Sequence, residues 1–108
     1  MSQCAKAYNV CGLRPRLDRF AHAMEAVLRQ HDRTKAGWWQ GSPNPRTWLT
    51  YLRAEVDELA GALDGERYGE ALQECCDVAN FAMMCFDAIV ELTDGDAGME
   101  RVGPVRDS

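Results

Sequence analysis

The fold is decided by the stretch from Thr47 to Leu92, which reads TWLTYLRAEVDELAGALDGERYGEALQECCDVANFAMMCFDAIVEL. Apolar residues in its first part recur at steps of three and four, which predicts a helix from about Thr47 to Leu63. Asp64-Gly65 then has turn chemistry, and a longer helix is expected from about Glu66 to Leu92. Because the connection is short, the two helices must pack as an antiparallel hairpin.

Outside this hairpin, apolar residues at helical spacing predict one more helix, from Leu17 to Gln30. The stretch from His31 to Arg46 is punctuated by glycines and prolines, so we expect a loop there. The expected fold is therefore all-α, with an N-terminal helix added to an antiparallel hairpin. The helical domain should cover residues 16–92, between an N-terminal segment over 1–15 and a poorly ordered tail over 93–108.

The longer helix of the hairpin is apolar over much of its circumference. Its buried stripe is predicted to consist of Leu72, Cys75, Val78, Ala79, Ala82, Phe86 and Ile89. Further apolar side chains on the same helix are Phe81, Met83, Met84 and Val90. Three helices of this size make a thin bundle, so some of this surface needs a partner. We expect a homo-oligomer, a dimer or a tetramer, in which helices of two subunits complete a four-helix core.

Composition limits the classes of protein that this chain can represent. Its 108 residues are enough for one domain, and 46% hydrophobic with 27% charged residues is typical of a globular protein. The net charge of −5 argues against binding to nucleic acid, which normally requires a basic face. Five cysteines without a CxxC pair favour reduced thiols and a cytoplasmic location. No signal segment is recognised, and the apolar stretch 78–90 is too short to span a bilayer.

Two pairs of carboxylates mark the candidate site. Glu55 and Glu58 are three residues apart on one predicted helix, as are Glu74 and Asp77 on the next, so each pair lies on a single helix face. Glu55 and Asp77 are equally far from residue 66 in the turn, and the same is true of Glu58 and Glu74. Folding the hairpin therefore brings the two pairs together. Their simplest alternative role, as solvated faces of amphipathic helices, is weakened by this mirror register.

Four converging carboxylates repel one another and are poorly solvated, so a counter-charge is needed. Hard divalent cations take oxygen ligands, and Mg²⁺ in particular is held by a few carboxylates together with water and substrate phosphates. The sequence therefore predicts a magnesium site made by Glu55, Glu58, Glu74 and Asp77. An acidic protein can hold a polyphosphate in this way, because the metal lies between the carboxylates and the substrate.

This arrangement resembles the all-α nucleoside triphosphate pyrophosphohydrolase superfamily, which includes MazG-like proteins, dimeric dUTPases and phosphoribosyl-ATP pyrophosphohydrolases. The matching residues read KAGWWQGSPNPRTWLTYLRAEVDELAGAL, from Lys35 to Leu63, and ECCDVANFAMM, from Glu74 to Met84. The shared pattern is ExxE, a spacer and ExxD, here with 15 residues between Glu58 and Glu74. Full-length MazG proteins carry two such domains, whereas this chain has one copy and looks more like the single-domain phage or bacterial enzymes.

The resemblance implies Mg²⁺-dependent hydrolysis of a nucleoside or deoxynucleoside triphosphate to the monophosphate and pyrophosphate, including dGTP or dATP, in control of the nucleotide pool. Mn²⁺ is expected to substitute for Mg²⁺. The four acidic residues would hold the metal, with Glu58 and Glu55 as the catalytic pair and Glu58 orienting or deprotonating the water. The predicted substrate-binding residues are Lys35, Trp38, Trp39, Arg53 and Asn80.

Several of these residues also fit other roles. Lys35 and Arg53 also fit ordinary surface positions, Trp38 and Trp39 also fit packing against the first helix, and Asn80 also fits a helix interface. His22 and His31 have no matching ligand partner and are interpreted as structural or exposed. For the whole chain, the alternatives are a catalytically silent helical interaction module and a phosphoribosyl-ATP pyrophosphohydrolase of the same fold.

Overall fold

All regular structure in the described part of the chain is helical. The computed structural model describes residues 11–34 and 44–93. It contains three helices, α1 (Pro15–Thr34), α2 (Pro45–Asp64) and α3 (Tyr68–Leu92). The all-α prediction is thus confirmed. The expected tail, most of the N-terminal segment and the centre of the expected loop lie outside the described residues.

The loop between the first two helices is shorter at both ends than predicted. The helix α1 continues four residues beyond Gln30, because no glycine or proline interrupts it before Thr34. The helix α2 begins at Pro45, whose missing N–H costs nothing in the first turn. Asn44 caps this end, since its side-chain oxygen accepts a hydrogen bond from the backbone N–H of Arg46 at 2.9 Å.

The turn between α2 and α3 lies one residue later than predicted, over Gly65 and Glu66. Glu66, and not Gly65, adopts the left-handed backbone conformation, with φ of 57°. The N–H of Arg67 then donates to the carbonyl of Ala62 at 2.8 Å, and that of Gly65 to the carbonyl of Gly61 at 3.0 Å. These bonds satisfy the last carbonyls of α2 and reverse the chain within three residues. As a result α3 begins at Tyr68, two residues later than predicted.

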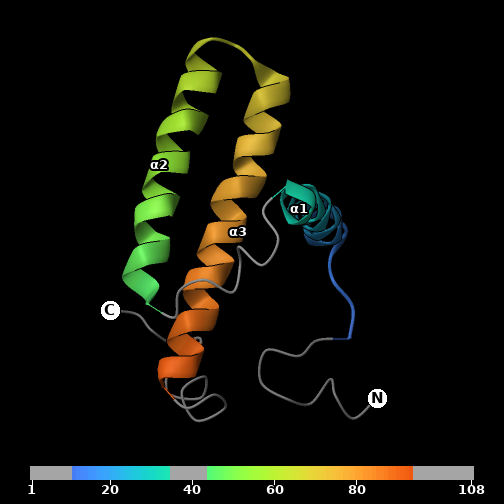
Figure 1. Cartoon of the computed structure of the whole chain (residues 1–108). Helices are drawn as coiled ribbons and strands as arrows, with labels where there is room; N and C mark the ends of the chain where they lie inside the picture. The colour runs from blue at the N-terminus through green and yellow to red at the C-terminus, as the bar shows by residue number, and fades with distance from the viewer. Residues whose placement is uncertain (1–10, 35–43, 94–108) are drawn as a thin grey trace, which may run out of the picture.

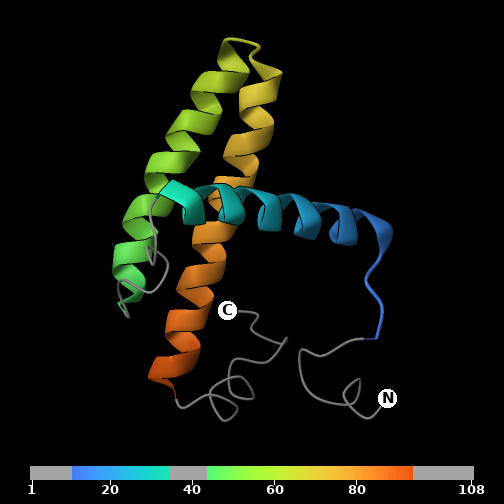
Figure 2. The same ribbon diagram turned by 45° about the vertical axis from the view of Figure 1, so that its right-hand side comes forward.

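The two long helices run side by side as an antiparallel pair, and α1 packs beside α3 (Figure 1). Figure 2 shows α1 from its side, running across α3 at a steep angle with its C-terminal end over the hairpin. The apolar core joins all three helices: Trp48, Met84 and Ala88 are buried, and Leu28 of α1 packs against them. The hairpin of α2 and α3 is therefore the main packing unit, and α1 covers one of its faces.

The buried side of α3 differs from the predicted one. Its buried residues are Ala71, Cys76, Asn80, Met84 and Ala88. Leu72 and Phe86, which were expected in the core, are 72% and 44% exposed. The reason is geometric, because α1 and α2 cover two faces of α3 and leave a third face open.

The thiols are only partly as expected. Cys75, Cys76 and Cys85 are free, as a reduced protein requires. Cys11 is disulfide-bonded, which corrects the prediction of reduced thiols for this residue. No helix in the described ranges has an apolar run of the length that a bilayer crossing requires.

Candidate metal centre

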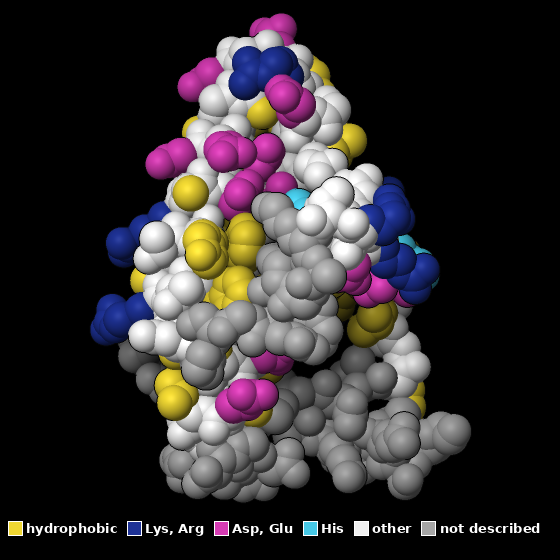
Figure 3. All heavy atoms as spheres, in the orientation of Figure 1, with side chains coloured by type: hydrophobic (Ala, Val, Ile, Leu, Met, Phe, Trp, Pro, Cys, Tyr) yellow, Lys and Arg dark blue, Asp and Glu magenta, His cyan; other side chains and the backbone are white. Residues whose placement is uncertain are grey.

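Three of the four predicted carboxylates meet between α2 and α3. Glu55, Glu58 and Glu74 each offer a carboxylate oxygen, and these oxygens all lie within 4.8 Å of one another. Figure 3 shows acidic side chains gathered where the two helices face each other, above a group of apolar side chains. The mirror register of the hairpin explains the meeting, because Glu58 and Glu74 are equally far from the turn. We call these three residues the acidic group.

Two oxygens of the acidic group are buried without a donor. Among the described residues, nothing donates a hydrogen bond to Oε1 of Glu55 or Oε1 of Glu74. A buried ionised oxygen without a donor or a cation costs free energy, because it has lost its water and gained nothing in exchange. Without a cation or a proton, the acidic group therefore lowers the stability of the hairpin.

The titration of Glu55 reflects this cost. Burial, followed by a hydrogen bond with Glu74, raises the pKa of Glu55 from 4.5 to about 8. The negative charges of Asp77, Glu58 and Glu74 raise this pKa further. A hydrogen bond between two carboxyl groups requires a proton, so this contact favours the protonated form of Glu55.

The donor set fits a divalent cation. All three side chains supply oxygen, the ligand type that Mg²⁺ and Mn²⁺ prefer over softer atoms. Glu58 is exposed while Glu55 and Glu74 are half-buried, so one side of the acidic group opens to solvent. A cation bound there would replace the missing donors of Glu55 and Glu74 and keep free positions for water or phosphate.

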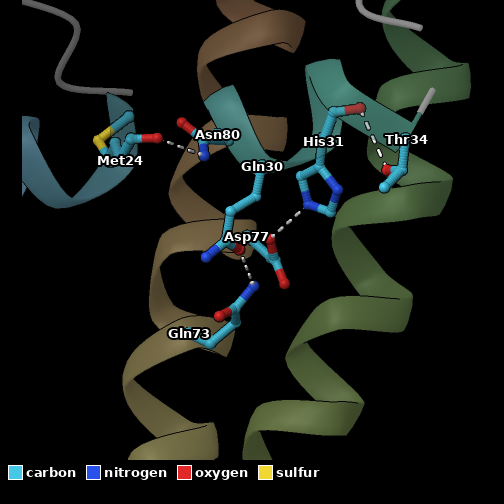
Figure 4. A network of polar contacts seen from close by, with 7 residues as sticks. All are labelled: Met24, Gln30, His31, Thr34, Gln73, Asp77 and Asn80. Atoms are coloured by element: carbon cyan, nitrogen blue, oxygen red, sulfur yellow. Dashed lines mark hydrogen bonds and ion pairs between the residues drawn. The ribbon is translucent and has the colours of Figure 1, made fainter. Parts of the chain in front are cut away.

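The fourth carboxylate, Asp77, is held by a histidine at the edge of the acidic group. Nε2 of His31 lies 3.3 Å from Oδ1 of Asp77 (Figure 4). The two side chains are 29% and 13% exposed, respectively. Asp77 is close enough for its charge to raise the pKa of Glu55, although it is not one of the three mutually close carboxylates.

His31 was missed as a site residue by the sequence analysis, which treated it as structural or exposed. Its contact with Asp77 spans 46 positions and depends on how α1 crosses α3, which no local pattern reveals. One signal was available. His31 continues the apolar positions Met24, Val27 and Leu28 at helical spacing, and this continuation places it on the inward face of α1.

The predicted substrate-binding residues are placed very differently. Asn80 is 2% exposed, and its Nδ2 donates to the carbonyl of Met24 in α1 at 3.3 Å. Its Oδ1 is buried without a partner in the described part of the chain. Arg53 is exposed and, at roughly 200° from Glu55 around the helix axis, points away from the acidic group. Lys35, Trp38 and Trp39 lie outside the described residues.

Comparisons of this chain with protein-family models, with curated proteins and with solved structures gave no match.

Proposed function

We propose that this protein hydrolyses nucleoside or deoxynucleoside triphosphates to the monophosphate and pyrophosphate, with Mg²⁺ as cofactor and Mn²⁺ as a substitute. The observation that carries the proposal is the acidic group, with three carboxylate oxygens within 4.8 Å of one another on two packed helices. Two of these side chains have buried oxygens without a donor. A protein gains nothing in stability from such an arrangement, which favours a role in binding a cation.

In this proposal Glu55, Glu58, Glu74 and Asp77 hold the metal. When bound, Mg²⁺ neutralises phosphate oxygens and stabilises charge on the pyrophosphate. The exposed carboxylate of Glu58 orients the attacking water and accepts its proton. The water oxygen forms a bond to the α-phosphorus, and the bond from this phosphorus to the bridging oxygen breaks. Glu55 must release its proton before it can act as a ligand, because a protonated carboxyl binds cations poorly.

We further propose that the protein works as a homo-oligomer. The open face of α3 carries exposed apolar side chains, including Leu72 and Phe86, and continues through Tyr68 and Ile89. Tyr68 and Leu72 are four residues apart, Leu72 and Phe86 fourteen, and Phe86 and Ile89 three, so all four positions lie on one face of the helix. Val56 and Leu63 of α2 are exposed as well. A second hairpin packed on this surface would complete a four-helix core.

The cytoplasm is the compartment that we propose, because the substrates are intracellular nucleotides. The three free cysteines of α3 agree with this placement. The disulfide bond of Cys11 is the observation that opposes it. Mass analysis of the protein isolated with its thiols blocked during extraction decides the point, since a cytoplasmic protein should carry a reduced Cys11.

The proposed activity is tested by incubating the purified protein with a panel of ribo- and deoxynucleoside triphosphates, dGTP and dATP among them, and with phosphoribosyl-ATP. We expect pyrophosphate from at least one triphosphate with Mg²⁺ and none when EDTA is present. No pyrophosphate from any compound would overturn the proposal and favour the silent interaction module. Cleavage of phosphoribosyl-ATP alone would keep the chemistry and replace the substrate.

A further inference from the structure

We propose that His31 is a positioning residue for the metal site, which holds Asp77 in place from a third helix. The inference rests on the proposed function, since it concerns the same carboxylates. It adds α1 to a site that the sequence predicts from α2 and α3 alone. The consequence is that binding of a divalent cation depends on a side chain that need not contact the cation.

The contact between His31 and Asp77 is specific and shielded. His31 lies in the last turn of α1, and its Nε2 is 3.3 Å from Oδ1 of Asp77. An ionised carboxylate only accepts hydrogen bonds, so Nε2 carries the hydrogen and donates it. Less than a third of either side chain is exposed, which limits competition from water. Asp77 therefore has one oxygen held by His31, while Oδ2 is not part of this contact.

Two neighbouring contacts fix α1 on α3 without touching a carboxylate. Nε2 of Gln73 donates to Oε1 of Gln30 at 3.4 Å, and Nδ2 of Asn80 donates to the carbonyl of Met24 at 3.3 Å. Figure 4 shows both beside the pair of His31 and Asp77. The docking of α1 thus has supports of its own. Because these two contacts hold α1 against α3, a substitution of His31 can change the position of Asp77 without displacing the helix.

Within the described ranges, the four carboxylates of the proposed metal site have no cationic partner other than His31. The remaining ion pairs there are Asp18 with His22, Glu25 with Arg29, and Glu70 with Arg67, and all are exposed. Carboxylates that bind metals are commonly oriented by a second hydrogen bond, and removal of that partner costs about 10- to 100-fold in metal affinity. His31 is placed to provide this bond for Asp77.

The test measures Mn²⁺ binding to the metal-free protein by electron paramagnetic resonance, without any nucleotide. His31→Leu removes the donor at similar volume, and we expect about 10- to 100-fold weaker binding. His31→Gln places an amide nitrogen at a similar reach and should restore binding to within about threefold of the wild type. Gln30→Leu breaks a contact between the same two helices and serves as the matched control, with unchanged affinity expected.

The outcomes separate the two proposals. If the wild type binds Mn²⁺ and His31→Leu binds it equally well, His31 has no positioning role and the proposed function stands. Equal losses in His31→Leu and Gln30→Leu would also overturn the inference, because they assign the effect to helix docking. If the wild type itself binds no Mn²⁺, the metal-dependent function falls, and the inference falls with it. In activity assays, we expect His31→Leu to need a higher Mg²⁺ concentration than the wild type and to reach the same kcat once Mg²⁺ is saturating.

Discussion

The two halves of the hairpin share one register about the turn and differ in chemistry. In the half far from the turn, Tyr51 of α2 faces Phe81 of α3, with ring centroids 5.5 Å apart. Trp48 lies beside Phe81 at 6.0 Å and is buried. In the half near the turn, the equivalent positions hold the acidic group. Tyr51 and Phe81 are equally far from residue 66, as are Glu58 and Glu74.

The difference lies in what each half does for stability. The aromatic half buries apolar surface and gains free energy without any ligand. The acidic half brings like charges together, buries oxygens without donors and raises the pKa of Glu55. A hairpin selected for stability alone would carry apolar pairs along its whole length. The acidic half is therefore where a function is expected.

The largest effect is expected for Glu55→Gln in the acidic half. Loss of this carboxylate should lower kcat/KM by about a thousandfold or more. The metal that stabilises negative charge on the phosphate oxygens in the transition state would lose one of its ligands. Steady-state pyrophosphate release measures this change. Asp77→Asn should have a comparable effect. Asp57→Asn is the control, since Asp57 is exposed and outside the acidic group; near-normal turnover in Glu55→Gln would contradict the site.

The aromatic half is tested by Trp48→Ala. Removal of a buried tryptophan from a small core should lower the free energy of unfolding by about 3 kcal/mol. Trp48→Phe, which keeps an aromatic ring, should lose clearly less. Urea denaturation monitored by circular dichroism gives both values. A loss in Trp48→Ala no larger than that of an exposed side chain would show that this half is not the stabilising one.

The pH dependence of stability should come from the acidic half. The folded protein keeps a proton on Glu55 up to about pH 8, whereas the unfolded chain releases it near pH 4.5. The free energy of unfolding should therefore fall as the pH rises through this interval. Glu55→Gln should be more stable than the wild type by about 1 kcal/mol at pH ~9, because solvent reaches part of the carboxyl, and equally stable at pH ~4.

Denaturation curves in EDTA measure this effect, and Asp57→Asn should retain the pH dependence of the wild type. The same fall in stability in Glu55→Gln would assign the titration to another group.

The smallest effect is expected at the turn, outside both halves. Arg67 and Glu70 form an exposed ion pair beside it. Glu70→Gln should change the free energy of unfolding by less than about 0.5 kcal/mol and leave Mn²⁺ affinity unaltered. Thermal unfolding with and without Mn²⁺ tests both points. A large loss of Mn²⁺ binding would mean that negative charge anywhere near the turn attracts the cation.

Local patterns were sufficient to predict most of the fold and the meeting of three of the four carboxylates. Helical spacing and a short turn predict the hairpin, and mirror positions predict the meeting of Glu58 with Glu74. The exposed face of α3 was not predicted correctly, because helical periodicity does not say which apolar face of α3 the neighbouring helices cover. His31 was missed for a related reason, since the crossing of α1 over α3 follows from tertiary packing. The left-handed Glu66 beside a glycine likewise has no local signature.

A crystal soaked with Mn²⁺ and measured for anomalous scattering tests the central claim most directly. We predict one strong peak between α2 and α3, bound by the carboxylates of Glu55, Glu58 and Glu74, with Asp77 beside it. No peak at saturating Mn²⁺, or these side chains directed into separate solvent regions after neighbouring subunits are included, would contradict the account.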